Sequence, residues 1–161
     1  MRIPFILCLV ILFAAFAASA QVPQYEAYPT GKLFDGKNAK PVITKFDRNF
    51  RTRIKWAADG KRDFAGEYIF TQFGCGMACR VTFILNARTG RVFWLPFTLC
   101  CWEPLESDPV VFRLDSRLLA LRGLRSEALG EYQDDKATDV HFYEFKNGRF
   151  RFIKTVRSQN H

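Results

Sequence analysis

Four cysteines carry the reactive groups that stand out in this sequence. Cys75 and Cys79 have three residues between them and lie in a glycine-rich stretch that ends at Arg80, and Cys100 is followed directly by Cys101. Thiolates in such pairs can bind zinc, exchange disulfides or form structural disulfides. The choice depends on the compartment of the protein and on the strands that hold the cysteines.

Residues 1–20 have the layout of a secretory signal peptide. Arg2 provides the charged start, residues 3–17 form an apolar block, and residues 18–20 are a small-residue cleavage site. A membrane-spanning helix would need about 20 apolar residues and no cleavage site. We therefore expect a periplasmic or secreted protein with no transmembrane segment after signal removal, and we expect Cys8 to leave with the peptide.

In an oxidising compartment, an even number of cysteines predicts disulfides. Structural zinc sites use two separated chelating pairs, whereas strand neighbours such as Cys100 and Cys101 point to opposite faces. For a redox dithiol, no helix signal follows Cys79 to stabilise a thiolate, although the vicinal pair could form a reducible ring. We expect neither a metal nor a cofactor at these sulfurs.

The hairpin between the two cysteine pairs determines which sulfurs can meet. Residues 88–90 join two apolar runs, 80–86 and 91–97, and predict a three-residue loop whose glycine is left-handed. Pairing Ala87 with Arg91 buries one wholly apolar face. That face is formed by Val81, Phe83, Leu85, Phe93, Leu95 and Phe97.

This register favours one disulfide pattern. It places Cys79 opposite Leu99 and on the face of Cys101, so that Cys79–Cys101 with Cys75–Cys100 is slightly preferred. The nested pattern, Cys79–Cys100 with Cys75–Cys101, stays open because the flanking glycines let the chain turn. In the chain-entropy model, one bond that closes a loop of about 26 residues adds about 3.5 kcal/mol.

The whole chain predicts a mainly β (α+β) fold, an antiparallel sheet or small sandwich of hairpins with one N-terminal helix. Residues 21–46 form an extended arm, and one domain covers residues 47–157. Strands are expected at residues 67–73, 80–86, 91–97, 110–114, 117–122, 139–146 and 149–155, and a mobile loop at residues 123–138.

Two elements have the strongest local signals. A helix is predicted over residues 48–59, with Asp47 as N-cap, Gly60 after its end and a buried stripe of Phe50, Ile54 and Ala57 or Ala58. The last hairpin turns at Asn147-Gly148, which suits a type I′ turn. Its register pairs Tyr143 with Phe152, Phe145 with Phe150 and Glu144 with Arg151.

Other reactive groups are few. His141 and His161 are the only histidines, and we interpret His141 as a structural residue opposite Lys154. Asp134 and Asp135 lack a calcium-loop signature and predict a solvated turn. The sequence contains no nucleophile, phosphate-loop or histidine-pair pattern, so we expect no catalytic residue.

The charge balance is basic. Removing residues 1–20 takes away Arg2 alone among the charged residues and leaves 141 residues with a formal charge of +7. The basic residues occur in short alternations, which predict a solvated cationic surface, with attraction to anionic lipid, polysaccharide or an acidic protein as the sharper alternative. Nucleic acid is not expected, because the aromatic residues fall on apolar strand faces.

Three stretches resemble a group of small secreted proteobacterial proteins of unknown function. They are Phe64-Ala65-Gly66-Glu67-Tyr68, then Phe73-Gly74-Cys75-Gly76-Met77-Ala78-Cys79, then Trp94-Leu95-Pro96-Phe97 ahead of Cys100-Cys101. The resemblance covers residues 48–154. It implies a helix before Phe64 and a periplasmic or secreted setting in a Gram-negative bacterium, and it implies no activity.

Trp94, Trp102 and Arg80 are the candidate partner-binding residues. If both tryptophans were exposed, they would form an aromatic patch beside the disulfides, and a second buried face is the alternative. We expect a non-enzymatic module that binds, inhibits or neutralises another secreted protein. The alternatives are a cationic protein associated with the envelope or a polyanion, and a thiol–disulfide redox protein that uses Cys100 and Cys101.

Overall fold

The computed structural model describes residues 21–76, 78–104, 107–128 and 131–157. The predicted signal peptide with Cys8 lies outside the described residues, as does His161. The elements are η1 (Tyr25–Ala27), η2 (Phe46–Phe50), α1 (Arg51–Ala58), β1 (Tyr68–Gly76), β2 (Cys79–Asn86), β3 (Val92–Trp94), β4 (Thr98–Cys100), β5 (Val110–Phe112), β6 (Leu118–Arg122), β7 (Leu124–Ala128), β8 (Glu131–Tyr132), β9 (Val140–Lys146) and β10 (Arg149–Val156).

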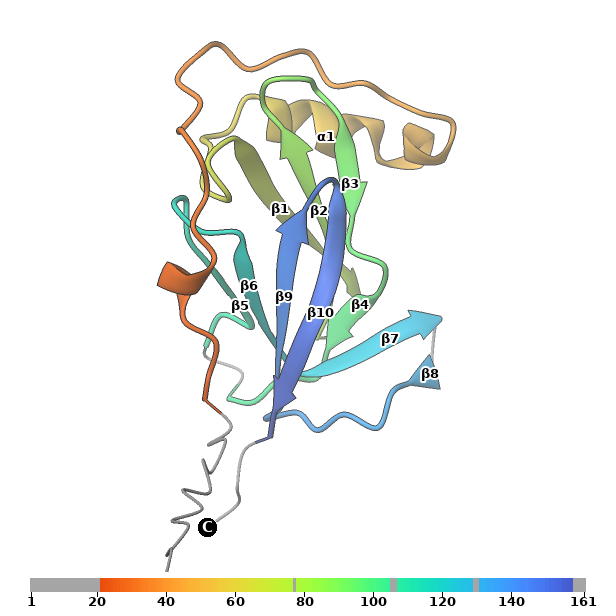
Figure 1. Ribbon diagram of the computed structural model, residues 1–161. Coiled ribbons are helices and arrows are strands. Elements are labelled where there is room, and N and C mark those ends of the chain that lie inside the picture. Colours follow the sequence, from red (N-terminus) through yellow and green to blue (C-terminus); the bar gives the residue numbers. More distant parts are fainter. Residues whose placement is uncertain (1–20, 77, 105–106, 129–130, 158–161) are drawn as a thin grey trace, which may run out of the picture.

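The fold is built on two antiparallel sheets (Figure 1). The larger sheet has the order β1-β2-β4-β7-β8, with β3 also paired to β2, and the smaller sheet has the order β10-β9-β6-β5. The main core contains residues of both sheets, such as Ile84 and Leu99 from the larger and Leu119 and Phe145 from the smaller. The prediction of a mainly β fold of antiparallel hairpins with one N-terminal helix is confirmed.

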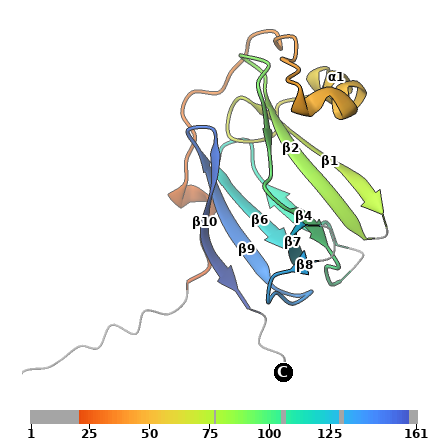
Figure 2. The ribbon, with the colours of Figure 1, turned by 90° about the vertical axis from the view of Figure 1, so that its right-hand side faces the viewer.

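Helix α1 covers part of the other face of the larger sheet (Figure 2). Its buried residues Ile54 and Ala58 belong to a second core with Ile69, Phe83 and Leu85 of β1 and β2. The predicted buried stripe is therefore confirmed. At this end of the molecule, the larger sheet is apolar on both faces, because α1 packs on one and the smaller sheet on the other.

The helical segment starts earlier than predicted, as the 3-10 helix η2. Asp47 lies inside η2 and is not an N-cap. Its carboxylate accepts hydrogen bonds from the Thr44 N–H at 2.8 Å and from the Trp94 indole N–H at 2.8 Å. The helix ends near the predicted glycine, since the Gly60 N–H donates to the Ala57 carbonyl at 2.9 Å.

The β2–β3 hairpin differs by one residue from the predicted register. Ile84 pairs with Phe93 and Phe83 pairs with Trp94, and the turn closes with a bond from the Asn86 N–H to the residue 91 carbonyl. The Asn86 side chain accepts the N–H groups of residues 88 and 89, which shapes the loop. Burial did not select the predicted register, because both faces of this hairpin are covered by apolar layers.

The last hairpin agrees with its prediction. Asn147 and Gly148 both have positive φ, 53° and 72°, as a type I′ turn requires. A bulge between Phe152 and Lys154 then shifts the register, so that His141 faces Thr155 and not Lys154. The three predicted pairs are present: Tyr143 with Phe152, Phe145 with Phe150 and Glu144 with Arg151.

The mobile loop predicted at residues 123–138 is wrong over part of its length, because β7 and β8 lie there. β7 pairs with β4 through Thr98 and Ser126 and extends the larger sheet. Arg125 and Glu127 gave this segment the polar composition of a loop. Arg125 is nevertheless buried, and its charge is paired inside the protein.

The arm passes beside β5 and β6 and then crosses the end of the larger sheet near α1 (Figure 1). It is held by backbone hydrogen bonds such as Phe34 N–H to the Gly66 carbonyl at 3.0 Å and Val42 N–H to the Gly90 carbonyl at 2.8 Å. Gly90 has the predicted left-handed conformation, with φ of 73°. A side chain at Gly90 would overlap the Lys40 carbonyl oxygen, so the glycine also lets the arm pass.

Candidate functional site

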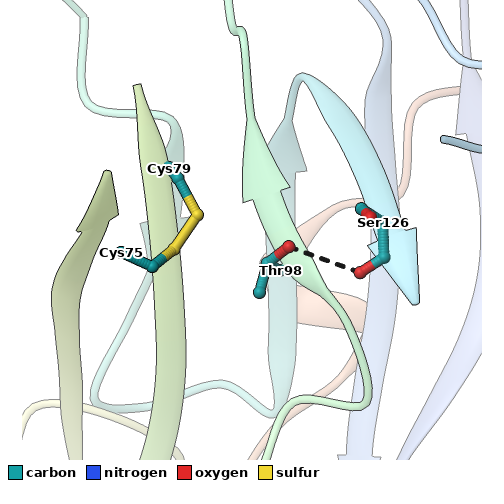
Figure 3. The surroundings of a disulfide bond; sticks show 4 residues. All are labelled: Cys75, Cys79, Thr98 and Ser126. Atoms are coloured by element: carbon teal, nitrogen blue, oxygen red, sulfur yellow. Dashed lines mark hydrogen bonds between the residues drawn. A yellow bond between two sulfur atoms is a disulfide. The ribbon is translucent and has the colours of Figure 1, made fainter. Parts of the chain in front are cut away.

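Cys75 and Cys79 form a disulfide, with Cα atoms 5.2 Å apart (Figure 3). Neither predicted pattern is formed, because both paired these residues with Cys100 and Cys101. The reason is the register at the end of β1, where a shift between Gly74 and Gly76 pairs Gly76 with Cys79 and so places Cys75 beside Cys79. In the chain-entropy model, so short a loop contributes about 2 kcal/mol.

Cys100 and Cys101 lie next to this disulfide. Cys79 pairs with Cys100 in the β2–β4 register, and the Cys101 N–H donates to the Ala78 carbonyl at 3.1 Å. Cys100 is buried and Cys101 is exposed, so their sulfurs lie in different environments. The vicinal ring considered for redox chemistry is not formed between these two residues.

The three candidate partner-binding residues do not form an exposed aromatic patch. Trp102 is 6% exposed, and the Arg80 guanidinium lies 5.5 Å from the centre of its ring. Trp94 is half-buried, with its ring centre 4.8 Å from that of Phe50 and 5.0 Å from that of Phe83. Both tryptophans therefore pack within the fold, as in the alternative expectation of a second buried face.

Asp47 fixes Trp94 against the helical segment. Burial by itself would raise the pKa of Asp47, but the hydrogen bonds from Thr44 and from the Trp94 indole outweigh it and lower that pKa. The carboxylate is thus an anion held inside the fold, and it joins η2 to β3.

The positive charge is concentrated in residues 37–62, which we call the basic cap and which include η2 and α1. The basic cap holds nine of the 24 Lys and Arg residues and two of the 16 Asp and Glu residues, a formal charge of +7. That equals the charge of the whole predicted mature chain, so the remainder is balanced. The nine are Lys37, Lys40, Lys45, Arg48, Arg51, Arg53, Lys55, Lys61 and Arg62.

Little within the protein neutralises the basic cap. Eight of its nine cations are exposed and Arg62 is half-buried. The ion pairs found in the described part of the chain involve none of them. Of its two acids, Asp47 is buried and already hydrogen-bonded, which leaves Asp59. The basic cap can therefore attract an external anion with almost no internal competition.

The basic cap also carries exposed aromatic side chains. Phe46 and Trp56 are each 70% exposed, more than any other large apolar side chain of the described residues. Residues two positions apart in an α-helix lie about 200° apart around its axis. Because Ile54 is buried against the sheet, Trp56 therefore points away from it. The helical stripe and the local excess of Lys and Arg are both visible in the sequence. The missed signal was that both occur in the same segment, so that the polar side of the helix is strongly basic.

A buried polar network lies between β7 and the β9–β10 hairpin. The Arg125 guanidinium donates to both carboxylate oxygens of Asp135, at 2.8 and 2.9 Å, and to the Tyr143 hydroxyl at 2.9 Å. Burial by itself would raise the pKa of Asp135, but the bonds from Arg125 lower it. The predicted solvated turn is therefore wrong for Asp135, whose side chain is 5% exposed, whereas Asp134 is fully exposed.

His141 is fully buried beside this network. Its Nε2–H donates to the Gly123 carbonyl at 2.7 Å, and its Nδ1 accepts from the Thr155 hydroxyl at 2.9 Å. Burial lowers the pKa of His141 and favours the neutral ring. Both ring nitrogens are satisfied, as predicted for a structural histidine.

Neither a metal site nor a membrane-spanning helix is found in the described residues. Among the described residues, no three His, Cys, Asp or Glu side chains are placed to bind a metal ion. In the same part of the chain, no helix is long and apolar enough to cross a membrane. Comparison of the chain with protein-family models, with curated proteins and with solved structures finds no significant match.

Proposed function

We propose that this protein is a secreted or periplasmic, non-enzymatic binding protein that attaches to an anionic lipid surface through the basic cap. One observation carries the proposal: the whole net charge of the predicted mature chain lies on the segment that also exposes Phe46 and Trp56. Near an anionic bilayer, each Lys or Arg contributes about 1 kcal/mol. If three cations reach the surface together, they contribute about 3 kcal/mol.

The aromatic residues favour lipid over a soluble polyanion. Electrostatic attraction alone would hold the cations to either partner, whereas an exposed indole or phenyl ring gains free energy at the headgroup boundary of a bilayer. Trp56 can enter that boundary without unfolding the helix, because Ile54 and Ala58 keep the opposite side of α1 on the sheet. The proposed contact therefore combines charge with shallow insertion.

Vesicle co-sedimentation of the mature protein tests the proposal, with phosphatidylcholine alone and with phosphatidylglycerol added. The wild type should bind only the anionic vesicles and should be released at about 0.5 M salt, where the Debye length is about 4 Å. A basic-cap triple variant should bind about 100-fold more weakly, and a control triple variant with the same change in charge should bind as the wild type does. The basic-cap variant is Arg48→Gln, Arg51→Gln and Lys55→Gln, and the control is Lys136→Gln, Arg151→Gln and Arg157→Gln.

A Trp56→Ser variant separates insertion from charge. It should weaken binding to anionic vesicles while leaving thermal stability unchanged, because the side chain is 70% exposed. Equal losses in the basic-cap and control variants, or equal binding to neutral vesicles, would show that the basic cap does not hold the protein to lipid. Undiminished vesicle binding by Trp56→Ser would leave a purely electrostatic contact and count against lipid as the specific partner.

Binding of another secreted protein is the second candidate, and the outer edge of β1 favours it. β1 is the edge strand of the larger sheet, and the Phe70 N–H on its outer side donates to Asp63. Beyond Phe70, no strand among the described residues pairs with this outer side. Unpaired edges can accept an extended segment of a partner. Gln72→Pro removes an outward N–H of this edge, so it should abolish such a complex and leave lipid binding intact; a complex that survives this change would not use the edge.

A further inference from the structure

A groove lies where the β9–β10 turn meets the larger sheet. It consists of two cavities, of about 400 and 410 Å³, that share Tyr68 and Asn147 as walls. Each volume is within the range of small-molecule sites. Gly148 lines the second cavity, and at φ of 72° it lies so close to Phe93 that a side chain would be 2.9 Å from that ring. The groove therefore joins both sheets through a turn with a defined conformation.

Four cations of the groove have no counter-ion among the described residues. Lys32 and Lys146 line the first cavity, Arg91 and Arg149 line the second, and all four are exposed. No carboxylate in the described residues forms an ion pair with any of them. The uncompensated charge is thus divided between the two sides of Tyr68.

The two other charged groups of the groove are already paired. Glu67 accepts from Arg88 at 2.9 Å and from the Asn86 amide at 2.7 Å. Arg117 donates to Glu144 at 3.0 Å. Neither group changes the excess of four positive charges that a ligand would meet.

The neutral groups between the cations suit a sugar. The Tyr68 ring is half-buried and is held by edge contacts with Phe145 and Phe93, with ring centres 4.9 and 6.2 Å away. A rigid aromatic ring packs against the C–H face of a pyranose, and the exposed amide of Asn147 can hydrogen-bond to its hydroxyl groups. Guanidinium groups bind the carboxylates of acidic sugars in bidentate geometry.

We propose that this groove binds an acidic saccharide of at least two units, with sugar carboxylates on both sides of Tyr68. The length follows from the division of charge, because a ligand with two carboxylates can place one in each cavity. This site is separate from the basic cap and does not depend on lipid binding.

Isothermal titration calorimetry with tetragalacturonate tests the proposal, with maltotetraose as the neutral analogue and inorganic sulfate as the small anion. The wild type should bind tetragalacturonate, bind maltotetraose at least tenfold more weakly, and show no saturable binding of sulfate at the same concentrations. The variant Arg91→Gln with Arg149→Gln should weaken binding at least tenfold, since each removes a charge-assisted contact. Lys136→Gln with Arg151→Gln, which lie outside both cavities, should change it less than twofold.

Asn147→Asp gives a second test that preserves the turn, because Asp also tolerates positive φ. It adds a negative charge to the wall shared by both cavities and should weaken tetragalacturonate binding. Absence of wild-type binding, equal losses in the groove and control variants, or equal affinity for maltotetraose would overturn the proposal. The basic-cap triple variant should bind the saccharide normally and the groove variant should bind vesicles normally, so failure of one proposal is distinguishable from failure of the other.

Discussion

Asp135→Asn probes the buried ion pair between β7 and the segment before β9. The substitution keeps the shape of the side chain but leaves Arg125, whose side chain is 11% exposed, without an anion. Removing one partner of a buried pair costs about 3 to 5 kcal/mol, and some exposure of Arg125 favours the lower value. With an unfolding entropy of about 2.1 cal/mol/K per residue, a 141-residue chain should lose about 10 °C in Tm.

Urea unfolding of the mature protein at neutral pH measures this loss. Asp134→Asn is the matched control, because its side chain is fully exposed and it should change the unfolding free energy by less than about 0.5 kcal/mol. Combining Asp135→Asn with Arg125→Met should cost less than the sum of the single changes, because each removes the same interaction. Equal effects at positions 134 and 135, or strict additivity in the double variant, would refute the assignment of a stabilising buried pair.

The pH dependence follows from the same geometry. The pKa of Asp135 is lowered in the folded protein, so its contribution is present above the unfolded value of about 3.9 and is lost as the pH falls below it. Asp135→Asn should therefore flatten the acid limb of the stability curve below about pH 4. The wild type and the variant should become more alike in stability as the pH is lowered through that range.

Two further predictions concern His141 and the cysteines. The pKa of His141 is lowered in the folded protein, so its contribution to stability is fully present above the unfolded value of about 6.5 and is lost as the pH falls below it. The unfolding free energy of His141→Gln should therefore change less than that of the wild type between about pH 7.5 and 5.5, as measured by urea unfolding at each pH. Tryptic mapping without reduction should give peptide 63–80 with an internal disulfide, separate from peptide 92–113, and a cross-link between them would show that Cys75 and Cys79 bond to Cys100 and Cys101 instead.

Local patterns were sufficient for several elements. Asn147-Gly148 specified its own turn, because both positions require positive φ, and that turn set the aromatic pairs of the last hairpin. The helical stripe was readable because Ile54 and Ala58 are one turn apart. These features depend on backbone conformation and side-chain period, which neighbouring residues determine.

The polar groups inside the fold could not be assigned in this way. Asp135 looked solvated because its partner, Arg125, lies ten residues earlier on a strand that had the composition of a loop. Trp94 finds its hydrogen-bond partner at Asp47, across the interface between helix and sheet. Such pairs depend on which segments meet, and one sequence contains no direct signal for that.

The sequence by itself determined the antiparallel hairpins, the helix and the concentration of positive charge in residues 37–62, since each is a local property. Only the tertiary structure decided the register of β2 with β3 and the partner of Cys75. The physical reason is that apolar layers cover both faces of the larger sheet, so that a shift of one residue still buries apolar side chains on each side. The exposure of Trp56 on the basic cap, from which the proposed function follows, likewise depended on which side of α1 packs against that sheet.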